Sequence, residues 1–287
     1  MVTIGLFPNI KKQSVVTVLN WMITYLCDRG IPVLLPEEIA QKTGHARLGR
    51  SWEELRREIT IGITLGGDGT ILHVARQVAS AGIPLCGVNM GQLGFLTEVE
   101  LSDISSALEK ILQQDYLVED RLMLDAVIIQ DGVEKYIGSA LNDVVITKNV
   151  ISRMLRLKLY VNSEFTANYS ADGLIISTST GSTGYSLSAG GPIISPNLRV
   201  VVVTPICPHS LHSRSLVVSE KESIKIDHAT QDAILTIDGQ VSFNLLPDDE
   251  VVIKSSAFSA KLVKLGERSY YETLRKKLWR GDTDADL

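Results

Sequence analysis

The sequence predicts a protein of two domains, in which an α/β domain with a parallel sheet precedes a β-rich domain and a helical C-terminal segment. Strand-like and helix-like segments alternate as far as about residue 115. Short β-branched runs separated by turn residues then follow, and helical spacing returns only in about the last twenty residues. We therefore expect an α/β domain over residues 1–115, a β-rich domain over 116–267 and a C-terminal helical segment over 268–287, whose helix can pack back on the first domain.

In the first domain, near-continuous apolar runs predict strands at residues 2–7, 31–35, 61–65 and 83–88. Apolar residues at helical spacing predict helices at residues 11–28, from about 70 to 81, and at 102–114. Ser51 and Glu54 form a capping-box pattern that predicts a further short helix. Strands that are apolar along their whole length are typical of a parallel sheet covered on both faces.

The second domain is predicted to be largely antiparallel. Its strand-like runs are residues 122–130, 140–146, 154–161, 172–178, 199–206, 223–227, 233–239 and 250–256. The pair Asp131 and Gly132 between two of these runs predicts a tight hairpin turn. The last predicted element is an amphipathic helix over residues 271–280.

The composition indicates a soluble protein that does not bind nucleic acid. The chain of 287 residues is 45% hydrophobic and 21% charged. Its net charge of -5 lacks the excess of positive charge that is typical of nucleic-acid-binding proteins. Three cysteines, Cys27, Cys86 and Cys207, are far apart in the sequence, which is typical of reduced thiols in the cytosol. Because no long apolar stretch and no signal-peptide pattern is found, we expect a cytoplasmic protein without a membrane partner.

A glycine cluster follows the third predicted strand, where Gly66, Gly67 and Gly69 surround Asp68. Ligands of α/β sheets bind at the carboxyl ends of strands, and backbone N–H groups at such a turn attract phosphate. A carboxylate is repelled by phosphate, so Asp68 needs another purpose. It can hold a metal, accept a proton from an attacking hydroxyl, or cap the following helix. The segment matches neither G-x-x-x-x-G-K-[ST] nor G-x-G-x-x-G.

Two further glycine-containing segments follow. The first, "NMGQLGFL", covers residues 89–96. The second, "ADGLIISTSTGSTGYSLSAGGP", covers residues 171–192 and holds eight Ser and Thr hydroxyls between Ser177 and Ser188. These hydroxyls can bind a ribose or a phosphate, and Tyr185 among them can stack on a base.

Taken together, these segments resemble the NAD kinase family, which phosphorylates the 2′-hydroxyl of the adenosine ribose of NAD. The matching segments, in the order of the family, are "GGDGT", "NMGQLGFL", "LNDVVI" at residues 141–146, the hydroxyl-rich segment and "PICPHSL" at 205–211. "GGDGT" alone also occurs in diacylglycerol and sphingosine kinases, whereas the long hydroxyl-rich segment is specific to NAD kinases. The resemblance implies a Rossmann-like first domain, a β-rich second domain, and a homodimer or homotetramer.

The resemblance also implies roles for individual residues. Asp68 matches the catalytic aspartate that takes the proton from the ribose hydroxyl. Gly66, Gly67 and Gly69 match the glycines on the phosphate side. The positions implied to bind NAD are Gly69, His73, Asn142, Asp143, Arg153, Asp172, Thr183, Gly184, Tyr185, Ser186, Leu187, Ser188 and Gln240. No residue is assigned as a protein ligand of a metal.

The expected function is therefore transfer of the γ-phosphoryl group of ATP to NAD, giving NADP and ADP. Mg²⁺ or another divalent cation is expected with ATP, because few lysines lie near the glycine segments. Polyphosphate stays open as an alternative donor. Two alternative functions also stay open, a lipid kinase of the diacylglycerol or sphingosine type and a non-catalytic regulator that binds NAD(H).

Overall fold

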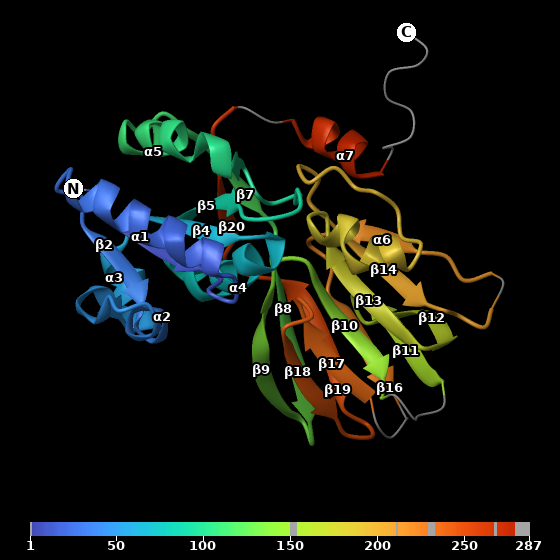
Figure 1. The fold of residues 1–287 in the computed structure, drawn as a ribbon. Helices are drawn as coiled ribbons and strands as arrows, with labels where there is room; N and C mark the ends of the chain where they lie inside the picture. Colours follow the sequence, from blue (N-terminus) through green and yellow to red (C-terminus); the bar gives the residue numbers. More distant parts are fainter. Residues whose placement is uncertain (1, 150–153, 211, 229–232, 267–268, 279–287) are drawn as a thin grey trace, which may run out of the picture. The chain divides into compact units, whose positions relative to one another are not determined.

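The structure is a computed structural model that describes residues 2–149, 154–210, 212–228, 233–266 and 269–278 (Figure 1). The chain divides into two compact units. The first is formed by Met1–Asp120 together with Ala260–Leu287, and the second by Arg121–Ser259. No described helix is long and apolar enough to cross a membrane.

An eight-stranded sheet forms the centre of the first unit. Its strands are β1 (Ile4–Pro8), β2 (Val33–Pro36), β3 (Gly49–Arg50), β4 (Ile61–Gly66), β5 (Pro84–Asn89), β6 (Val99–Glu100), β7 (Leu117–Arg121) and β20 (Ala260–Lys264). The strand order is β3-β2-β1-β4-β5-β20-β7, with β6 beside β5. The pairs β1–β2, β1–β4, β4–β5 and β5–β20 are parallel, which confirms the parallel sheet predicted from the apolar runs.

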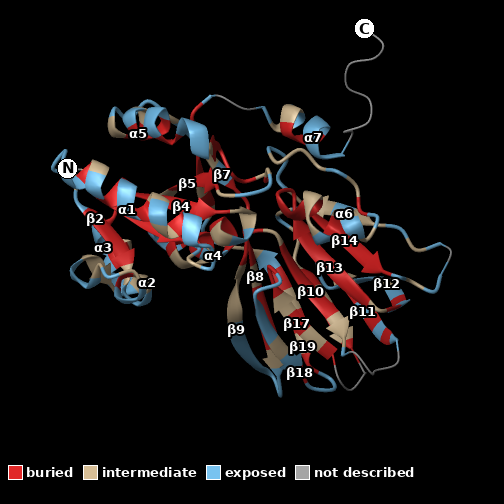
Figure 2. Cartoon of the chain, in the orientation of Figure 1, coloured by how far each residue is buried: buried red, intermediate tan, exposed pale blue. Residues whose placement is uncertain are grey.

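Helices cover both faces of this sheet. They are α1 (Gln13–Cys27), α2 (Glu37–Lys42), α3 (Trp52–Glu58), α4 (Asp68–Val78) and α5 (Ile104–Leu112), whereas α7 (Tyr270–Leu278) contacts the loop after β5. Residues of α1 and α5 share a buried core with Ile63 and Val88 of the central strands. On the opposite face, Ile71 of α4 lies against Gly87, because side chains of a strand alternate between the two faces. Figure 2 shows that the central strands between these helices are buried.

Several local predictions for the first unit are confirmed. The Ser51 side chain accepts a hydrogen bond from Glu54 N, and the Glu54 carboxylate accepts one from Ser51 N, so α3 begins with the predicted capping box. Helix α7 contacts the first unit, since Lys277 Nζ donates to the Leu93 carbonyl at 2.9 Å and the Tyr270 ring lies 6.2 Å from the Phe95 ring. The C-terminal helix therefore packs back on the α/β unit.

The strand β20, which the sequence analysis does not predict, joins the sheet of the first unit. Residues 260–264 fall within the range predicted for the β-rich domain, but Leu262 pairs with Leu85 of β5 in the first unit. Lys261 Nζ forms an ion pair with Asp120 at 2.8 Å, and both Leu262 and Val263 are buried. The local sequence does not show which sheet these residues join, because the partner strand β5 is far away in the chain.

Two six-stranded antiparallel sheets form the second unit. Their orders are β15-β14-β13-β10-β17-β18 and β12-β11-β16-β19-β8-β9. The strands are β8 (Leu124–Gln130), β9 (Val133–Ala140), β10 (Asp143–Lys148), β11 (Leu155–Val161), β12 (Glu164–Ala171), β13 (Gly173–Thr178), β14 (Val200–Ile206), β15 (Leu216–Ser219), β16 (Ile224–His228), β17 (Ala233–Ile237), β18 (Val241–Leu245) and β19 (Glu250–Ser255). Leu157 of one sheet and Ile176 of the other belong to the same buried core.

The sheet that contains β10 is covered on both faces. Val144 and Ile146 point into the core, whereas Val145 packs with Ile175 on the outer face. The short helix α6 (Tyr185–Ser188) and the residues after it cover part of that outer face, where Ala189 contacts the small outer cluster. This double coverage explains why β10 and β13 are apolar along most of their length.

The predicted hairpin turn at Asp131 and Gly132 joins β8 to β9, and both residues have positive φ.

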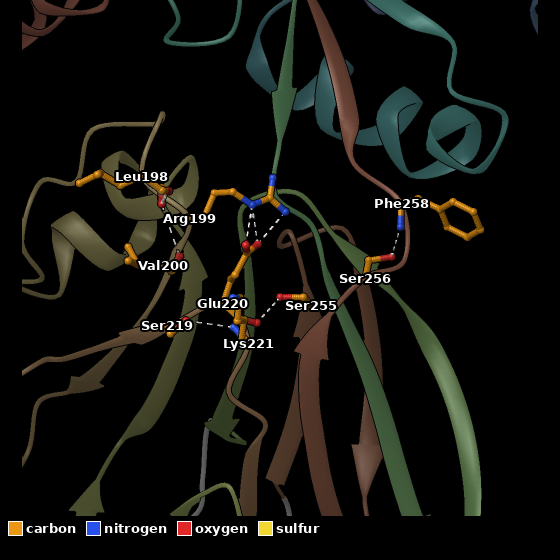
Figure 3. Close-up of polar contacts among 10 residues, drawn as sticks. Leu198, Arg199, Val200, Ser219, Glu220, Lys221, Ser255, Ser256 and Phe258 are labelled. Carbon is orange, nitrogen blue, oxygen red and sulfur yellow. Dashed lines mark hydrogen bonds and ion pairs between the residues drawn. The ribbon is translucent and has the colours of Figure 1, made fainter.

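Polar contacts around Glu220 link the two sheets of the second unit (Figure 3). Both carboxylate oxygens of Glu220 pair with Arg199, which lies just before β14. The backbone carbonyl of Glu220 accepts a hydrogen bond from the Ser255 hydroxyl of β19.

Candidate active site

The glycine-rich segment after β4 forms a tight turn into α4. Gly67 is the N-cap of α4, and its carbonyl accepts a hydrogen bond from Thr70 N at 2.9 Å. A Cβ on Gly66 would collide with the Thr70 side chain, so this close approach requires glycine. The positive end of the helix dipole therefore lies directly after a central strand, which is a favourable position for a phosphate group.

Asp68 is the first residue of α4, and two backbone amides hold its carboxylate. Oδ2 accepts a hydrogen bond from Phe95 N at 2.8 Å, and Oδ1 accepts one from Leu96 N at 3.0 Å. Gly67 is the N-cap of the helix, so the interpretation of Asp68 as the N-cap is wrong. The side chain is half-buried and fixed by these two bonds. Each carboxylate oxygen can still accept from a further donor.

The neighbouring loop leaves no space for a side chain beside this carboxylate. A Cβ on Gly94 would lie 2.6 Å from Asp68 Cγ and closer still to Oδ1. We therefore expect Gly94→Ala to displace the carboxylate and to lower kcat by about tenfold, because Asp68 is the predicted catalytic residue and such groups tolerate little displacement. Steady-state kinetics of the variant measure this effect.

Gly91→Ala is the matched control for Gly94→Ala, because it changes a glycine of the same loop. The nearest atom to a Cβ on Gly91 is Lys12 Nζ at 3.3 Å, the end of a flexible side chain. The prediction for Gly94 is wrong if both variants have the same kcat.

In the second unit, Asp238 holds the loop that carries Asn142 and Asp143. Its Oδ1 accepts hydrogen bonds from Asn142 N at 2.8 Å and Asp143 N at 3.1 Å, and its Oδ2 accepts from Leu141 N at 3.1 Å. In return, Asp238 N donates to the Asp143 carbonyl at 2.9 Å. One buried carboxylate therefore satisfies three successive backbone amides.

Thr178 at the end of β13 holds the same loop from its other side. Its hydroxyl donates to the Leu141 carbonyl at 2.6 Å, and its backbone N–H donates to the Asn142 carbonyl at 2.8 Å. A Cβ on Gly181 would lie 2.7 Å from Asn142 Cα, so the hydroxyl-rich loop can approach this closely only with glycine there. The side-chain oxygen of Asn142 is buried and has no hydrogen-bond partner.

A cavity of about 460 Å³ lies beside this loop within the second unit. Its lining residues are Asn142, Asp143, Val145, Thr147, Tyr185, Thr236, Asp238 and Gly239. Residues 143, 145 and 147 of β10 share one face of the sheet, and Val145 pairs with Thr236 of β17. The volume lies within the range of small-molecule sites. Asn142, Asp143 and Tyr185 give the lining polar groups that can bind a ligand.

Asp143 has an unusual acidity. Burial, and then the negative charge of Asp238, raise the pKa of the Asp143 carboxyl group from 3.8 to about 7. At a pH between 3.8 and about 7, the folded protein therefore holds a proton on Asp143 that the unfolded chain has released. Between pH 3.8 and about 7, this group lowers the free energy of unfolding as the pH rises.

We expect the free energy of unfolding of the wild-type protein, compared with that of Asp143→Asn, to fall as the pH rises towards 7. Asparagine resembles the protonated acid but does not ionise, so it removes this dependence. Urea unfolding of both proteins across that pH range measures the difference. A constant difference would contradict the raised pKa of Asp143.

The structure brings part of the predicted NAD-binding set together. Thr183 and Gly184 lie in the turn before α6, and Tyr185, Ser186, Leu187 and Ser188 form that helix. A Cβ on Gly184 would lie 3.4 Å from Asn142 Nδ2 and 4.0 Å from Asp143 Oδ2, so this turn adjoins the pair. The Ser186 hydroxyl is buried against Thr204 at 3.0 Å, which indicates a structural role for that side chain.

Other predicted residues lie elsewhere. Asp172 lies at the opposite end of the β10–β13 pair from Asp143, and its carboxylate forms an ion pair with Lys148 at 2.6 Å. Gln240 lies in the same turn as Asp238, and its backbone N–H donates to the Ile237 carbonyl. Arg153 lies outside the described residues.

His73 lies on α4 in the first unit, and its ring lies edge-on to that of Trp52, with a centroid distance of 6.0 Å and an interplanar angle of 72°. Burial, and then the positive charge of Arg76, lower the pKa of His73, which keeps the imidazole neutral near pH 7. This histidine therefore belongs to an aromatic cluster of the first unit.

Comparison with known proteins decides the family. The model of the ATP-NAD kinase N-terminal domain matches residues 4–116, and that of the ATP-NAD kinase C-terminal domain matches residues 141–265. An NAD kinase of Natranaerobius thermophilus is 44% identical over 283 residues, which cover 98% of this chain and 99% of the relative. An NAD kinase of Caldanaerobacter subterraneus subsp. tengcongensis is 42% identical, covering 97% of this chain and 99% of the relative. The chain belongs to the NAD kinase family.

Two solved structures have the same fold as this NAD kinase family member. An NAD kinase from Archaeoglobus fulgidus in complex with ATP has a TM-score of 0.76 and 25% identity, covering 96% of this chain and 99% of that chain. A yeast NADH kinase complexed with NADH has a TM-score of 0.91 and 23% identity, covering 100% and 90%. The second likeness is evidence for the fold alone.

The sequence did not identify every residue around the cavity. Asp238 is interpretable as an ordinary turn residue before glycine, and nothing local predicts that it binds amides of residues 141–143. Val145, Thr147 and Thr236 look like ordinary strand residues, although they line the cavity. The alternation of side chains between the two faces of β10, combined with its strand pairing, is the signal that reveals them.

Proposed function

We propose that this NAD kinase family member transfers the γ-phosphoryl group of ATP to the 2′-hydroxyl of the adenosine ribose of NAD, giving NADP and ADP. The observation that carries the proposal is the half-buried Asp68 carboxylate, which two backbone amides hold at the start of α4, directly after a glycine turn suited to phosphate. A general base and a phosphate site on adjacent residues are what phosphoryl transfer to a hydroxyl requires.

In this proposal, Asp68 accepts the proton of the ribose 2′-hydroxyl as that oxygen attacks the γ-phosphorus. The amides of Phe95 and Leu96 orient the carboxylate and leave lone pairs for the hydroxyl. Gly66, Gly67 and Gly69 allow the phosphates to approach the backbone at the N-terminus of α4. Positioning and charge stabilisation, rather than covalent catalysis, then supply the rate enhancement.

The cavity of the second unit is proposed to bind the adenosine part of NAD. Asn142, which lines the cavity, binds the base or ribose through its side-chain amide, and Asp143 supplies a donor when protonated. Tyr185 borders the cavity with its ring exposed, so it can stack on the adenine. Thr183, Gly184 and Ser188 complete the proposed contacts, and Asp172, Arg153 and Gln240 are proposed to bind other parts of NAD.

Mg²⁺ is proposed to accompany ATP. Among the described residues, no group of three or more His, Cys, Asp or Glu side chains could hold a metal ion. Mg²⁺ in nucleotide sites takes most of its ligands from phosphates and water, so this chain fits a metal that enters with its nucleotide. When bound there, the metal neutralises charge on the phosphates.

The remaining proposals concern the phosphoryl donor, the location of the enzyme and its oligomeric state. We propose ATP as the donor, with polyphosphate as an alternative, and a cytoplasmic enzyme that forms a homodimer or homotetramer. The net charge of -5 supports a protein without a nucleic-acid partner. Light scattering during size-exclusion chromatography distinguishes dimer from tetramer.

One assay tests the proposed function. The protein is incubated with NAD, ATP and Mg²⁺, and NADP is detected with an NADP-specific dehydrogenase. Formation of NADP that depends on all three supports the proposal. Binding of NAD without NADP formation would favour a non-catalytic regulator, and phosphorylation of diacylglycerol or sphingosine instead of NAD would favour a lipid kinase.

A further inference from the structure

The loop that holds Asp68 is itself held at both ends by the strands around it. This loop, residues 90–98, lies between β5 and β6 and contains the two amides that bind the Asp68 carboxylate. At its start, Met90 N donates to the Gly66 carbonyl of β4 at 2.9 Å. At its end, the Glu98 N–H donates to a carbonyl of β5 at 2.9 Å. These contacts involve only backbone groups.

The carboxylate of Glu98 adds a side-chain contact with a distant part of the chain. Oε1 accepts a hydrogen bond from Leu265 N at 2.9 Å, and Oε2 pairs with Lys264 Nζ. These partners lie at and just after the end of β20, 166 and 167 residues later in the chain. The side chain of Glu98 is only 2% exposed. Glu98 therefore fastens the end of the 90–98 loop to β20 inside the protein.

The ion pair of Glu98 and Lys264 lies in a buried environment. Burial, and then the negative charge of Glu98, raise the pKa of the nearby Cys86 thiol from 9.0 to about 12, whereas the positive charge of Lys264 lowers it. Taking two charges out of water costs free energy, and an apolar pair of similar size often stabilises a protein equally well. The geometry that this pair fixes therefore explains it better than the stability that it adds.

Helix α7 contacts the same loop. Lys277 Nζ donates to the Leu93 carbonyl at 2.9 Å and lies 4.6 Å from the centroid of the Phe95 ring. Phe95 is also the residue whose N–H binds Asp68 Oδ2. The chain that follows the second unit therefore holds the 90–98 loop both before and after the two amides.

A shift of the 90–98 loop displaces the Asp68 carboxylate. The amides of Phe95 and Leu96 bind its two oxygens separately, so they fix its orientation as well as its position. Gly94 lies so close that a Cβ there would be 2.6 Å from Asp68 Cγ. Since a small displacement of a catalytic group lowers the rate strongly, whatever holds the loop also controls catalysis.

We infer that Glu98 and Lys277 are positioning residues for Asp68. Glu98 fixes the 90–98 loop through Lys264 and Leu265, Lys277 fixes it from α7, and the loop fixes the carboxylate. The inference rests on the proposed function, in which Asp68 is the general base. The C-terminal part of the chain is then needed for catalysis, although it lies outside the motifs that identified the site.

The first test is kinetic. Different oxygens of Glu98 make its two contacts, so glutamine keeps one acceptor and loses the other together with the charge. Glu98→Gln is expected to lower kcat for NADP formation by about tenfold at a temperature where the variant is folded, while KM for NAD and KM for ATP stay unchanged. Asp120→Asn is the matched control, because Asp120 forms an ion pair with Lys261 of the same strand β20. Wild-type kcat in Glu98→Gln, or an equal loss in both variants, would overturn the inference.

A double-mutant cycle tests whether Glu98 acts through Asp68. If it does, Glu98→Gln leaves the residual kcat of Asp68→Asn unchanged, because the base whose position it controls is already lost. A similar loss of kcat in both backgrounds would show that Glu98 acts independently of Asp68 and would overturn the inference.

Lys277→Met is a second variant that does not disturb the core, because Lys277 is exposed on α7. We expect it to lower kcat by about threefold with unchanged KM values, a smaller effect because exposed contacts are weak. Lys276→Met is the matched control, since the neighbouring Lys276 forms its ion pair with Glu272 of the same helix. Equal kcat in the two variants would overturn the role of Lys277.

The last test measures the loop without turnover. Hydrogen exchange of the Phe95 and Leu96 N–H groups, which Asp68 protects, becomes about tenfold faster in Glu98→Gln and stays at the wild-type rate in Asp120→Asn. Wild-type exchange in Glu98→Gln would overturn the inference. If the wild-type protein forms no NADP, the proposed function fails, whereas the exchange rates still show whether Glu98 holds the loop.

Discussion

Asp68→Asn is expected to lower kcat for NADP formation by about 10²–10⁴-fold, the range that general-base catalysis contributes. Asparagine has nearly the same shape as aspartate but is not basic, so the 2′-hydroxyl of NAD keeps its proton at the moment of attack. The affinity for NAD, measured by equilibrium binding, stays within about an order of magnitude because the change removes only the base.

A second effect of Asp68→Asn has to be separated from the first. Both oxygens of Asp68 accept from backbone N–H groups, so the amide nitrogen of asparagine must face Phe95 N or Leu96 N. This donor–donor contact costs about 1–3 kcal/mol of stability. Thermal unfolding of the variant measures that cost, and kinetics at a temperature where it is folded measure catalysis. Wild-type kcat in the folded variant would exclude Asp68 as the base.

Asp238→Ala is expected to have the largest effect in the second unit. It leaves the amides of residues 141–143 without their common acceptor in a region where Asp238 and Asp143 are buried. Each orphaned buried donor costs about 1–3 kcal/mol, so the free energy of unfolding falls by about 3–9 kcal/mol unless the loop rearranges. In either case the position of Asn142 is lost, and the affinity for NAD falls by about tenfold or more.

Asp131→Ala is the matched control for this variant. Both aspartates precede a glycine in a β-turn with positive φ, at 52° for Asp131 and 50° for Asp238. Asp131 is exposed, so its variant carries the backbone strain of the substitution without the loss of buried hydrogen bonds. Urea unfolding and NAD binding of both variants separate the effect of backbone strain from the effect of the lost hydrogen bonds. Equal losses in the two variants would show that Asp238 does not position the Asn142–Asp143 loop.

Much of the fold was predictable because its signals are local. The capping box of Ser51 and Glu54, the Asp131–Gly132 turn and the apolar strands each depend on residues that are close in sequence. The start of α4 was predicted about two residues late, because Gly67 takes the N-cap position and Asp68 is already helical. The sheet that contains β20 was not predictable from its composition, since pairing with β5 joins segments far apart in the chain.

The candidate site shows the same difference between local features, which are predictable, and contacts with distant residues, which are not. Asp68 and Asn142 were identified from their motifs, but their surroundings depend on distant residues. The amides that hold Asp68 are 27 and 28 residues away in the chain, and the carboxylate that holds Asn142 N is 96 residues away. A single sequence indicates which side chains carry the chemistry, whereas the groups that orient them become visible only when the chain is folded.

The position of β20 has a consequence for how the chain is made. This strand lies between β5 and β7, yet it is synthesised after the whole second unit. Until residue 264 has left the ribosome, one edge of β5 is paired only with the two residues of β6, and an open edge of an apolar sheet invites pairing with other chains. The nascent protein therefore depends on the second unit folding promptly, so that the chain can return and complete the sheet with which it began.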